Sequence, residues 1–330
     1  MRNRQIVLAS RPTGKVDASS FRMVESDTAS PREGQVLTRV RWLSVDPYMR
    51  GRMDGGPSYA APQPLGEVMQ GGTVAEVIES RHPALKAGDL VVGAAGWQEY
   101  QVADGGTLRK IDASVVPASA YLGCVGMPGV TAWYGLLKIC EPKPGETVVV
   151  SAAAGAVGSV VGQLARIAGC RAVGIAGGPA KCEHVVRDLG FDACVDYRSA
   201  SFREDLKAAT PRGVDGIFEN VGGDVLEAAL ARVNAFGRVA VCGLIAGYDG
   251  KDIPLRNVRA LLVGRLRVQG FIVSDHLPLW PQALAELAAH VAAGRITWRE
   301  TVAEGLEAAP EAFLGMLRGE NLGKQLVKVS

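Results

Sequence analysis

Short apolar runs separated by glycine and proline fill the first part of the chain. Residues 36–40, 72–79 and 90–94 are such runs, and turn-forming stretches such as 61–64 interrupt them. Many short strand-like segments with frequent turns are typical of a barrel-like β domain. We therefore expect residues 1–125 to form a β-rich domain.

The pattern changes near Met127, where apolar runs begin to alternate with amphipathic, helix-like segments such as 159–168 and 226–233. This alternation predicts a parallel sheet covered by helices on both faces. Six strands suit a doubly wound Rossmann fold, which we expect over residues 126–294. The strand candidates are residues 147–151, 171–175, 193–195, 216–219, 238–242 and 267–272.

The last part of the chain carries a third pattern, with a short strand predicted at 296–298, a helix at 309–318 and a closing strand at 324–329. Because these elements are too few to form a core of their own, we expect residues 295–330 to complete the first domain. The predicted fold class is thus α/β, a doubly wound parallel sheet with a second, β-rich domain.

Charge and composition narrow the function classes. The formal net charge is +2 with acids and bases interspersed, which argues against a nucleic-acid-binding surface. No apolar run is long enough to cross a bilayer, and the first residues lack a secretory pattern, so we expect a cytoplasmic protein. The six cysteines form no CxxC pair and are expected to be free thiols.

A glycine-rich loop follows the first strand of the predicted Rossmann domain. The stretch 153–158 fits the G-x-G-x-x-G pattern with Ala153 in the first place. Gly155 allows close approach of a pyrophosphate, and Gly158 allows close packing of helix on strand. Ala156 and Val157 lie between them, where the helix N-terminus offers N–H groups to phosphates. A plain tight turn is the alternative interpretation.

The end of the second predicted strand indicates which dinucleotide binds. An NAD site carries an acid there for the ribose 2′-hydroxyl, but residues 176–178 are Ala-Gly-Gly. Lys181 follows and can pair with a 2′-phosphate, and Tyr197 comes after the third strand at the same sheet edge. These features favour NADP(H). The alternative makes Lys181 a solvated lysine and Tyr197 a core ring.

Metal ligands are scarce in the first predicted domain. It contains only His82 and Cys124 as histidine and cysteine candidates, and the remaining histidines are scattered along the rest of the chain. A zinc site needs several such ligands converging on one point. We therefore expect no zinc, and negative charge that develops on a substrate must be met by hydrogen-bond donors.

Several stretches resemble the zinc-independent branch of the medium-chain dehydrogenase/reductase superfamily, in the group of leukotriene B4 dehydrogenases, prostaglandin reductases, plant double-bond reductases and bacterial curcumin-reductase-like proteins. The resemblance covers essentially the whole chain, and Asp-Pro-Tyr-Met-Arg at 46–50 and Glu-Asn-Leu-Gly-Lys at 320–324 are specific to this branch. The other matching stretches are 43–45, 126–132, 152–158, 219–223, 269–271 and Gly319.

The resemblance implies a GroES-like first domain, a homodimer joined through the last Rossmann strand, and a set of site residues. Lys181 and Tyr197 would contact the 2′-phosphate, while Tyr48 and Tyr248 would lie near the substrate. The alternative makes Tyr48 a core aromatic and Tyr248 a loop residue. The family often has serine at Gly178, so one phosphate donor is missing here. The remaining cofactor contacts that it implies are Asn220, Cys242, Gly243 and Asn321.

The activity implied is NADPH-dependent reduction of the carbon–carbon double bond of an enone or enal. The enolate oxygen would be stabilised by the cofactor's ribose 2′-hydroxyl, Tyr48 or Tyr248, and Tyr248 or water would protonate the α-carbon. Two alternatives stay open, because a fold does not fix a function. One is a quinone or alcohol oxidoreductase, and the other is an NADPH-binding redox sensor without turnover.

Overall fold

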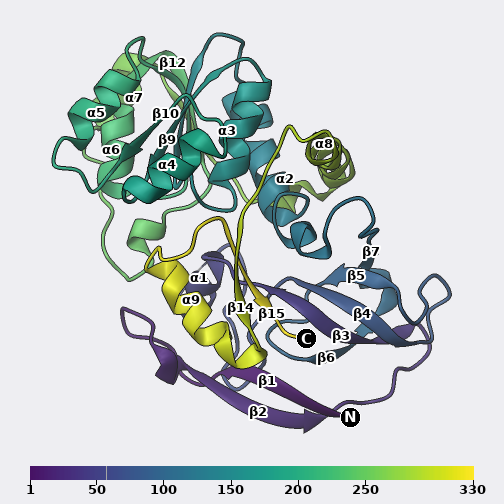
Figure 1. The fold of residues 1–330 in the computed structure, drawn as a ribbon. Helices are drawn as coiled ribbons and strands as arrows, with labels where there is room; N and C mark the ends of the chain where they lie inside the picture. Colours follow the sequence, from purple (N-terminus) through teal and green to yellow (C-terminus); the bar gives the residue numbers. More distant parts are fainter. Residues whose placement is uncertain (57) are drawn as a thin grey trace. The chain divides into compact units, whose positions relative to one another are not determined.

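The computed structural model describes residues 1–56 and 58–330, and these divide into two compact units (Figure 1). One unit joins both ends of the chain, Met1–Leu122 and Glu300–Ser330, and is called the terminal unit below. The other, Gly123–Arg299, is called the central unit.

A six-stranded, all-parallel sheet forms the middle of the central unit, in the order β10-β9-β8-β11-β12-β13. Numbered along this unit the order is 3-2-1-4-5-6, the doubly wound Rossmann topology, so that fold prediction is confirmed. All six predicted strands are present. Their bounds are β8 Thr147–Ser151, β9 Arg171–Ala176, β10 Ala193–Asp196, β11 Val214–Glu219, β12 Val233–Val241 and β13 Arg267–Gly270.

Helices connect these strands and cover the sheet. Helix α3 follows β8 and turns Val160, Val161 and Leu164 into the core, as its amphipathic pattern predicts. Every residue of β8 is buried, which suits the middle of a sheet covered on both faces. The helices of this unit are α2 Met127–Tyr134, α3 Gly158–Ile167, α4 Pro179–Arg187, α5 Phe202–Ala209, α6 Gly223–Leu230, α7 Val258–Gly264 and α8 Trp280–Ala292.

The terminal unit is built on a second, largely antiparallel sheet in the order β14-β15-β3-β4-β5-β7, with β6 also paired to β3. This sheet is the β-rich domain that the sequence predicts, and its short helices are α1 Tyr48–Arg52 and α9 Ala309–Leu317. Its strands, with the separate pair β1 and β2, are β1 Arg2–Leu8, β2 Phe21–Asp27, β3 Gln35–Ser44, β4 Thr73–Ser80, β5 Leu90–Gly93, β6 Tyr100–Asp104, β7 Arg109–Lys110, β14 Glu300–Glu304 and β15 Lys324–Lys328.

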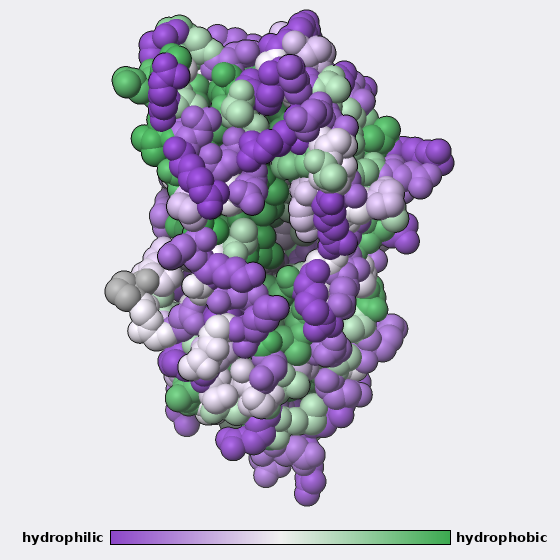
Figure 2. Space-filling model, turned by 90° about the vertical axis from the view of Figure 1, so that its left-hand side faces the viewer, coloured by the Kyte–Doolittle hydropathy of each residue, from purple (hydrophilic) through white to green (hydrophobic). Residues whose placement is uncertain are grey.

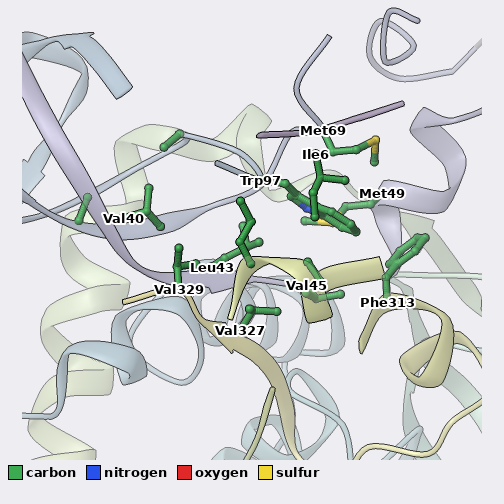
Figure 3. Packing of buried hydrophobic residues seen from close by; sticks show 14 of the residues in the cluster. Ile6, Val40, Leu43, Val45, Met49, Met69, Trp97, Phe313, Val327 and Val329 are labelled. Carbon is green, nitrogen blue, oxygen red and sulfur yellow. The ribbon is translucent and has the colours of Figure 1, made fainter. Parts of the chain in front are cut away.

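An apolar core holds this sheet and its helices together (Figure 3). Trp97 lies at its centre, stacked on Phe21 with ring centroids 5.3 Å apart and in edge contact with Phe313 of α9. Met49 of α1 joins the same core, and so does Val327 of β15. The first and last parts of the chain therefore share one core.

One strand prediction is wrong. Residues 296–298 form no strand, and β14 begins later, at Glu300. Ile296 is buried as the apolar pattern suggested, but the next backbone N–H, that of Thr297, donates to the side chain of Gln163 at 2.8 Å instead of to a neighbouring strand. A side chain from α3 thus takes the hydrogen bond that a sheet partner would otherwise accept.

The surface mixes hydrophilic and apolar residues. In Figure 2 hydrophilic residues predominate on the visible face, and apolar residues show between them in separate groups. Among the described residues, no helix combines the length and apolar character needed to cross a membrane.

Candidate functional site

The glycine loop lies between β8 and α3, at the carboxyl end of the first strand of the central sheet. Its backbone turns sharply, since the Gly155 N–H donates to the Ala152 carbonyl at 2.9 Å. A Cβ atom at Gly158 would lie only 2.4 Å from the same carbonyl oxygen, whereas one at Gly155 would lie 3.2 Å away. Gly158 is therefore required by packing, as predicted, while Gly155 mainly keeps the outer side of the loop open.

The N-terminus of α3 faces the same loop. Val157 precedes the helix and provides no side-chain cap. The first N–H groups of a helix have no acceptor within it, and together they attract anions. The loop leads from β8, whose two neighbours are β9 and β11, so it lies where the strand order reverses. This is the position at which doubly wound sheets bind ligands.

A cluster of cations and donors lies at the ends of β9 and β10; we call Gly178, Lys181, Tyr197 and Arg198 the phosphate cluster. The Tyr197 ring lies against Gly177, where an added Cβ would come within 3.0 Å of the phenol oxygen. Tyr197 is 44% exposed, so the alternative of a core ring is wrong.

A second cation, Arg198, affects the charge state of Lys181. Lys181 is half-buried rather than fully solvated, and its burial together with the charge of Arg198 lowers its pKa. The Arg198 guanidinium lies 5.7 Å from the centre of the Tyr197 ring. Sequence reasoning missed Arg198, although a cation directly after Tyr197 was a readable signal. Two cations close together suit a doubly charged phosphate better than one.

Asp196 is a carboxylate at this end of the sheet that the acid-free stretch 176–178 does not reveal. Its Oδ1 accepts the backbone N–H groups of Gly178 at 2.8 Å and Arg198 at 2.9 Å. These two hydrogen bonds hold the pKa of Asp196 below its usual value. The carboxylate thus fixes the backbone of the cluster. Gly178 has φ +94°, a conformation that a serine would rarely adopt, so a serine at this position would strain the backbone.

A buried acid organises the other end of the site. Glu219, at the end of β11, accepts the Gly222 N–H at 2.7 Å and the Ser151 hydroxyl at 3.0 Å. Its backbone carbonyl accepts the N–H groups of Cys242 at 2.8 Å and Gly243 at 3.1 Å. Burial raises the pKa of Glu219. One residue therefore links the ends of β8, β11 and β12.

Asn220, Cys242 and Gly243 are held close together by these links. The Asn220 amide donates to the Ser151 carbonyl at 2.8 Å, and a Cβ on Gly243 would lie 3.2 Å from the Asn220 carbonyl oxygen. Desolvation raises the pKa of the Cys242 thiol to about 12. Cys242 is therefore a neutral thiol at physiological pH, which suits contact with a ligand better than nucleophilic attack.

Tyr248 belongs to the loop that follows β12. It ends a short 3₁₀ turn, Ile245–Gly247, and is half-buried. The Ile245 and Ala246 N–H groups donate to the carbonyls of Asn220 and Val221, at 3.3 and 2.9 Å. The turn before Tyr248 is thereby tied to the loop after β11. Tyr248 thus follows the same carboxyl edge of the sheet as the other predicted residues of this unit.

Tyr48 lies in the terminal unit, at the first position of α1. The residues Met49 and Met53 anchor this short helix in the core. Arg52 lies between two rings, 6.0 Å from the centre of Tyr48 and 4.6 Å from that of Tyr59, which the sequence analysis did not single out. Burial, and secondarily the charge of Asp46, raises the pKa of Tyr48. Its hydroxyl therefore acts as a proton-bearing donor, not as a base.

The two branch-specific motifs of the sequence meet in the terminal unit. The buried ammonium of Lys324 donates to the Val45 carbonyl at 2.7 Å and to the Asp46 carboxylate at 3.1 Å. This ion pair fixes the backbone that leads into Tyr48. The amide of Asn321 donates to the Gly323 carbonyl at 2.8 Å within its own turn. Its proposed cofactor contact remains a prediction.

The side chains that could hold a metal ion lie apart from one another in the described residues. Among residues 1–56 and 58–330 no group of three or more histidine, cysteine, aspartate or glutamate side chains is placed to hold a metal ion. His82 accepts the Ala84 N–H through Nδ1 at 3.3 Å, within its own loop. Absence of zinc remains a prediction for elemental analysis.

Comparison with known proteins places these features in context. The chain matches two family models, the N-terminal domain of oxidoreductase over residues 4–111 and zinc-binding dehydrogenase over residues 156–289. It is 46% identical to the NADPH-dependent curcumin reductase of Escherichia coli, over 100% of this chain and 97% of the relative. It is 41% identical to the NADP(+)-dependent 2-alkenal reductase of Nicotiana tabacum, over 99% of this chain and 98% of the relative.

A solved structure agrees with the sequence comparison. The crystal structure of CurA from Vibrio vulnificus in complex with NADPH superposes with a TM-score of 0.95 at 43% identity, covering 99% of both chains. The likeness therefore extends over nearly the whole chain.

Proposed function

Since the chain belongs to the zinc-independent group of the medium-chain dehydrogenase/reductase superfamily, we propose that it is an NADPH-dependent reductase of α,β-unsaturated ketones and aldehydes. The observation that carries the proposal is the 41–46% identity, over nearly the full chain, to relatives named for curcumin and 2-alkenal reduction. The reaction saturates the carbon–carbon double bond and leaves the carbonyl intact.

The central unit fits the cofactor NADP(H). The open glycine loop and the N-terminus of α3 would hold the pyrophosphate, and Lys181, Arg198 and Tyr197 would hold the 2′-phosphate. Gly178 contributes backbone to the same cluster. Asn220, Cys242 and Gly243 would line the nicotinamide side, with Asn321 from the terminal unit as a further contact. When bound, NADPH supplies the hydride for the β-carbon.

The chain's own contribution to the chemistry is donation of hydrogen bonds. Charge develops on the carbonyl oxygen as the double bond is reduced, and a hydroxyl aimed at that oxygen stabilises it. Tyr248 would donate to the enolate and pass a proton to the α-carbon. Tyr48, whose pKa is raised by burial, keeps its proton throughout the neutral range and would help to hold the substrate.

A panel of enones, enals and quinones, assayed for NADPH consumption with product identification, tests this proposal. Conversion of an enone to its saturated ketone supports it. Preferential turnover of quinones, or formation of an alcohol from the carbonyl, would favour the oxidoreductase alternative. NADPH binding without turnover of any compound would favour a redox sensor.

The sheet edge of the central unit supports a homodimer as part of the proposal. Strand β13 is the outermost strand, all four of its residues are exposed, and Val268 is 45% exposed. Leu262 on α7 is 80% exposed. An exposed edge strand leaves backbone N–H and C=O groups on one side that can pair with a second copy. Light scattering should give twice the chain mass of 34.7 kDa, and Val268→Lys with Leu262→Asp should give monomers. A monomeric parent protein would contradict this.

A cytoplasmic location is the last part of the proposal. The six cysteines are free thiols in the structure, which suits a reducing compartment. Fractionation of cells that express a tagged chain tests it, and recovery outside the cytoplasm would overturn it.

A further inference from the structure

Two cysteine thiols face each other beside the phosphate cluster. Cys182 lies on α4 and Cys194 on β10, and their sulfur atoms are 3.1 Å apart, with the Cys194 thiol donating to Cys182. Both side chains are partly exposed. A disulfide has its sulfurs about 2.05 Å apart, so the two atoms need to approach by only about 1 Å.

We propose that Cys182 and Cys194 form an oxidation-sensitive dithiol, which hydroperoxides close to a disulfide and which thereby weakens the binding of NADPH. The modification itself needs only this thiol pair. Its effect on the cofactor rests on the function proposed above. Cytoplasmic disulfides are usually transient and regulatory, in agreement with such a role.

The chemistry assigns different roles to the two sulfurs. The hydrogen bond from Cys194 lowers the pKa of Cys182, while burial and, to a smaller extent, the charge of Asp196 oppose this effect. The same hydrogen bond, together with burial, raises the pKa of Cys194. Cys182 is therefore the thiolate that reacts first, and Cys194 is the resolving thiol.

The reaction balances in two steps. The Cys182 thiolate attacks one oxygen of the hydroperoxide, the O–O bond breaks, and the released hydroxide or alkoxide takes up a proton, leaving a sulfenic acid. Cys194 then attacks the Cys182 sulfur, the S–S bond forms, the S–O bond breaks, and water leaves with the Cys194 proton. Both sulfurs are oxidised and the peroxide is reduced.

Two other thiols, those of Cys140 and Cys170, have raised pKa values, unlike Cys182. Burial raises the pKa of Cys140 to about 12, and that of Cys170 to about 11. These thiols are neutral at physiological pH and react slowly with peroxide. Oxidation should therefore favour Cys182 over these two thiols.

The disulfide would tie together the two arms of the phosphate cluster. Helix α4 carries Lys181 directly before Cys182, and β10 ends at Asp196, directly before Tyr197 and Arg198. Asp196 also holds the Gly178 N–H at the start of α4. Drawing the sulfurs together shifts α4 against β10 and moves Lys181 away from its place. By linkage, bound NADP(H) should shift the thiol–disulfide equilibrium toward the dithiol.

Peptide mapping tests the modification. The full-length protein is treated with hydrogen peroxide, alkylated and digested with trypsin, which separates the adjacent peptides 182–187 and 188–198. We expect these two peptides to be linked, the intact mass measured before alkylation to be lower by two hydrogens, and dithiothreitol to reverse the change. Oxidation of Cys182 to sulfinic acid without a link, or no reaction, would overturn the proposal.

Fluorescence titration with NADPH tests the coupling. The dissociation constant should rise about threefold or more on oxidation, because a displaced cation loses part of a charge-assisted hydrogen bond, and it should recover on reduction. The Cys182→Ser/Cys194→Ser protein should bind NADPH with the dissociation constant of the reduced parent, and treatment with peroxide should not change that constant. An unchanged dissociation constant in the linked protein would also overturn the proposal. If the cofactor assignment itself were wrong, the reduced parent would not bind NADPH, although the link would still form.

Discussion

Lys181 is the residue on which cofactor selectivity depends most directly. Its ammonium lies in the phosphate cluster with Arg198, and an ion pair or charged hydrogen bond of this kind contributes about 1.5–3 kcal/mol. We predict that Lys181→Ala raises the KM for NADPH by about 10-fold or more and barely changes NADH kinetics.

Lys207 on α5 provides the matched control for this substitution. It is an exposed lysine of the same unit, outside the cluster, so Lys207→Ala should leave both cofactors unaffected. Steady-state kinetics with each cofactor make the comparison. Equal use of NADPH and NADH by the parent enzyme would rule out the selectivity argument.

Tyr248 carries the prediction for the chemical step. Tyr248→Phe removes only the hydroxyl and keeps the ring, so packing should hold. We expect kcat for an enone to fall about 100-fold or more, as for other positioned donors, with little change in NADPH affinity. Tyr48→Phe should act more weakly and mainly on substrate KM.

Slow product release could hide this effect, so single-turnover kinetics provide the readout. If both single variants and the double variant keep the parental rate of the chemical step, the tyrosines are not the donors.

At the residue scale the sequence reveals residue types but not their neighbours. The absence of an acid at 176–178 and the presence of Lys181 were both readable. The sequence did not identify Asp196 and Arg198 as site residues, because they come close to Gly178 only through the pairing of β9 with β10. The contact of Cys182 with Cys194 is not visible in the sequence either, because the two cysteines lie 12 residues apart and meet only through the packing of α4 on β10.

At the scale of elements, the loop between β8 and α3 allows packing and binding to be separated. Gly158→Ala would place a methyl group 2.4 Å from the Ala152 carbonyl, so we predict a clear fall in Tm along with lost NADPH binding. Gly155→Ala meets the same oxygen at 3.2 Å and should keep a Tm near that of the parent while weakening NADPH binding.

Thermal unfolding and NADPH titration of both variants make this comparison. The matched pair isolates the role of the loop because the two changes add the same methyl group. A Gly155→Ala protein that binds NADPH normally would show that the pyrophosphate does not lie against this loop.

Periodicity predicted the elements of the central unit because buried parallel strands are nearly continuous apolar runs. Residues 296–298 show the limit of that signal. Ile296 is apolar and buried, yet Gln163 bonds the adjacent backbone, and no local pattern reveals a side chain that competes with a strand. The strand therefore begins at Glu300 instead.

At the scale of the whole molecule, the two branch-specific motifs are in direct contact. Lys324 near the end of the chain holds Val45 and Asp46 near its beginning, across 278 residues of sequence for the ion pair. Sequence comparison could mark both motifs, but only the pairing of β15 with β3 shows that they form one structure. That structure places Tyr48.

We predict that the purified protein contains no stoichiometric zinc. No three ligand side chains converge among the described residues, so elemental analysis should find zinc well below one atom per chain. Activity should survive dialysis against a chelator, with a zinc-dependent alcohol dehydrogenase as the positive control. Stoichiometric zinc, together with loss of activity on its removal, would refute this prediction.

The destination of the hydride tests the central claim most directly. The enzyme is incubated with an enone and NADPH deuterated at C4 of the nicotinamide, in ordinary water, and the product is examined by NMR. The account predicts a saturated ketone with deuterium on the β-carbon and hydrogen from water on the α-carbon. Deuterium on the carbonyl carbon, in an allylic alcohol, would contradict it.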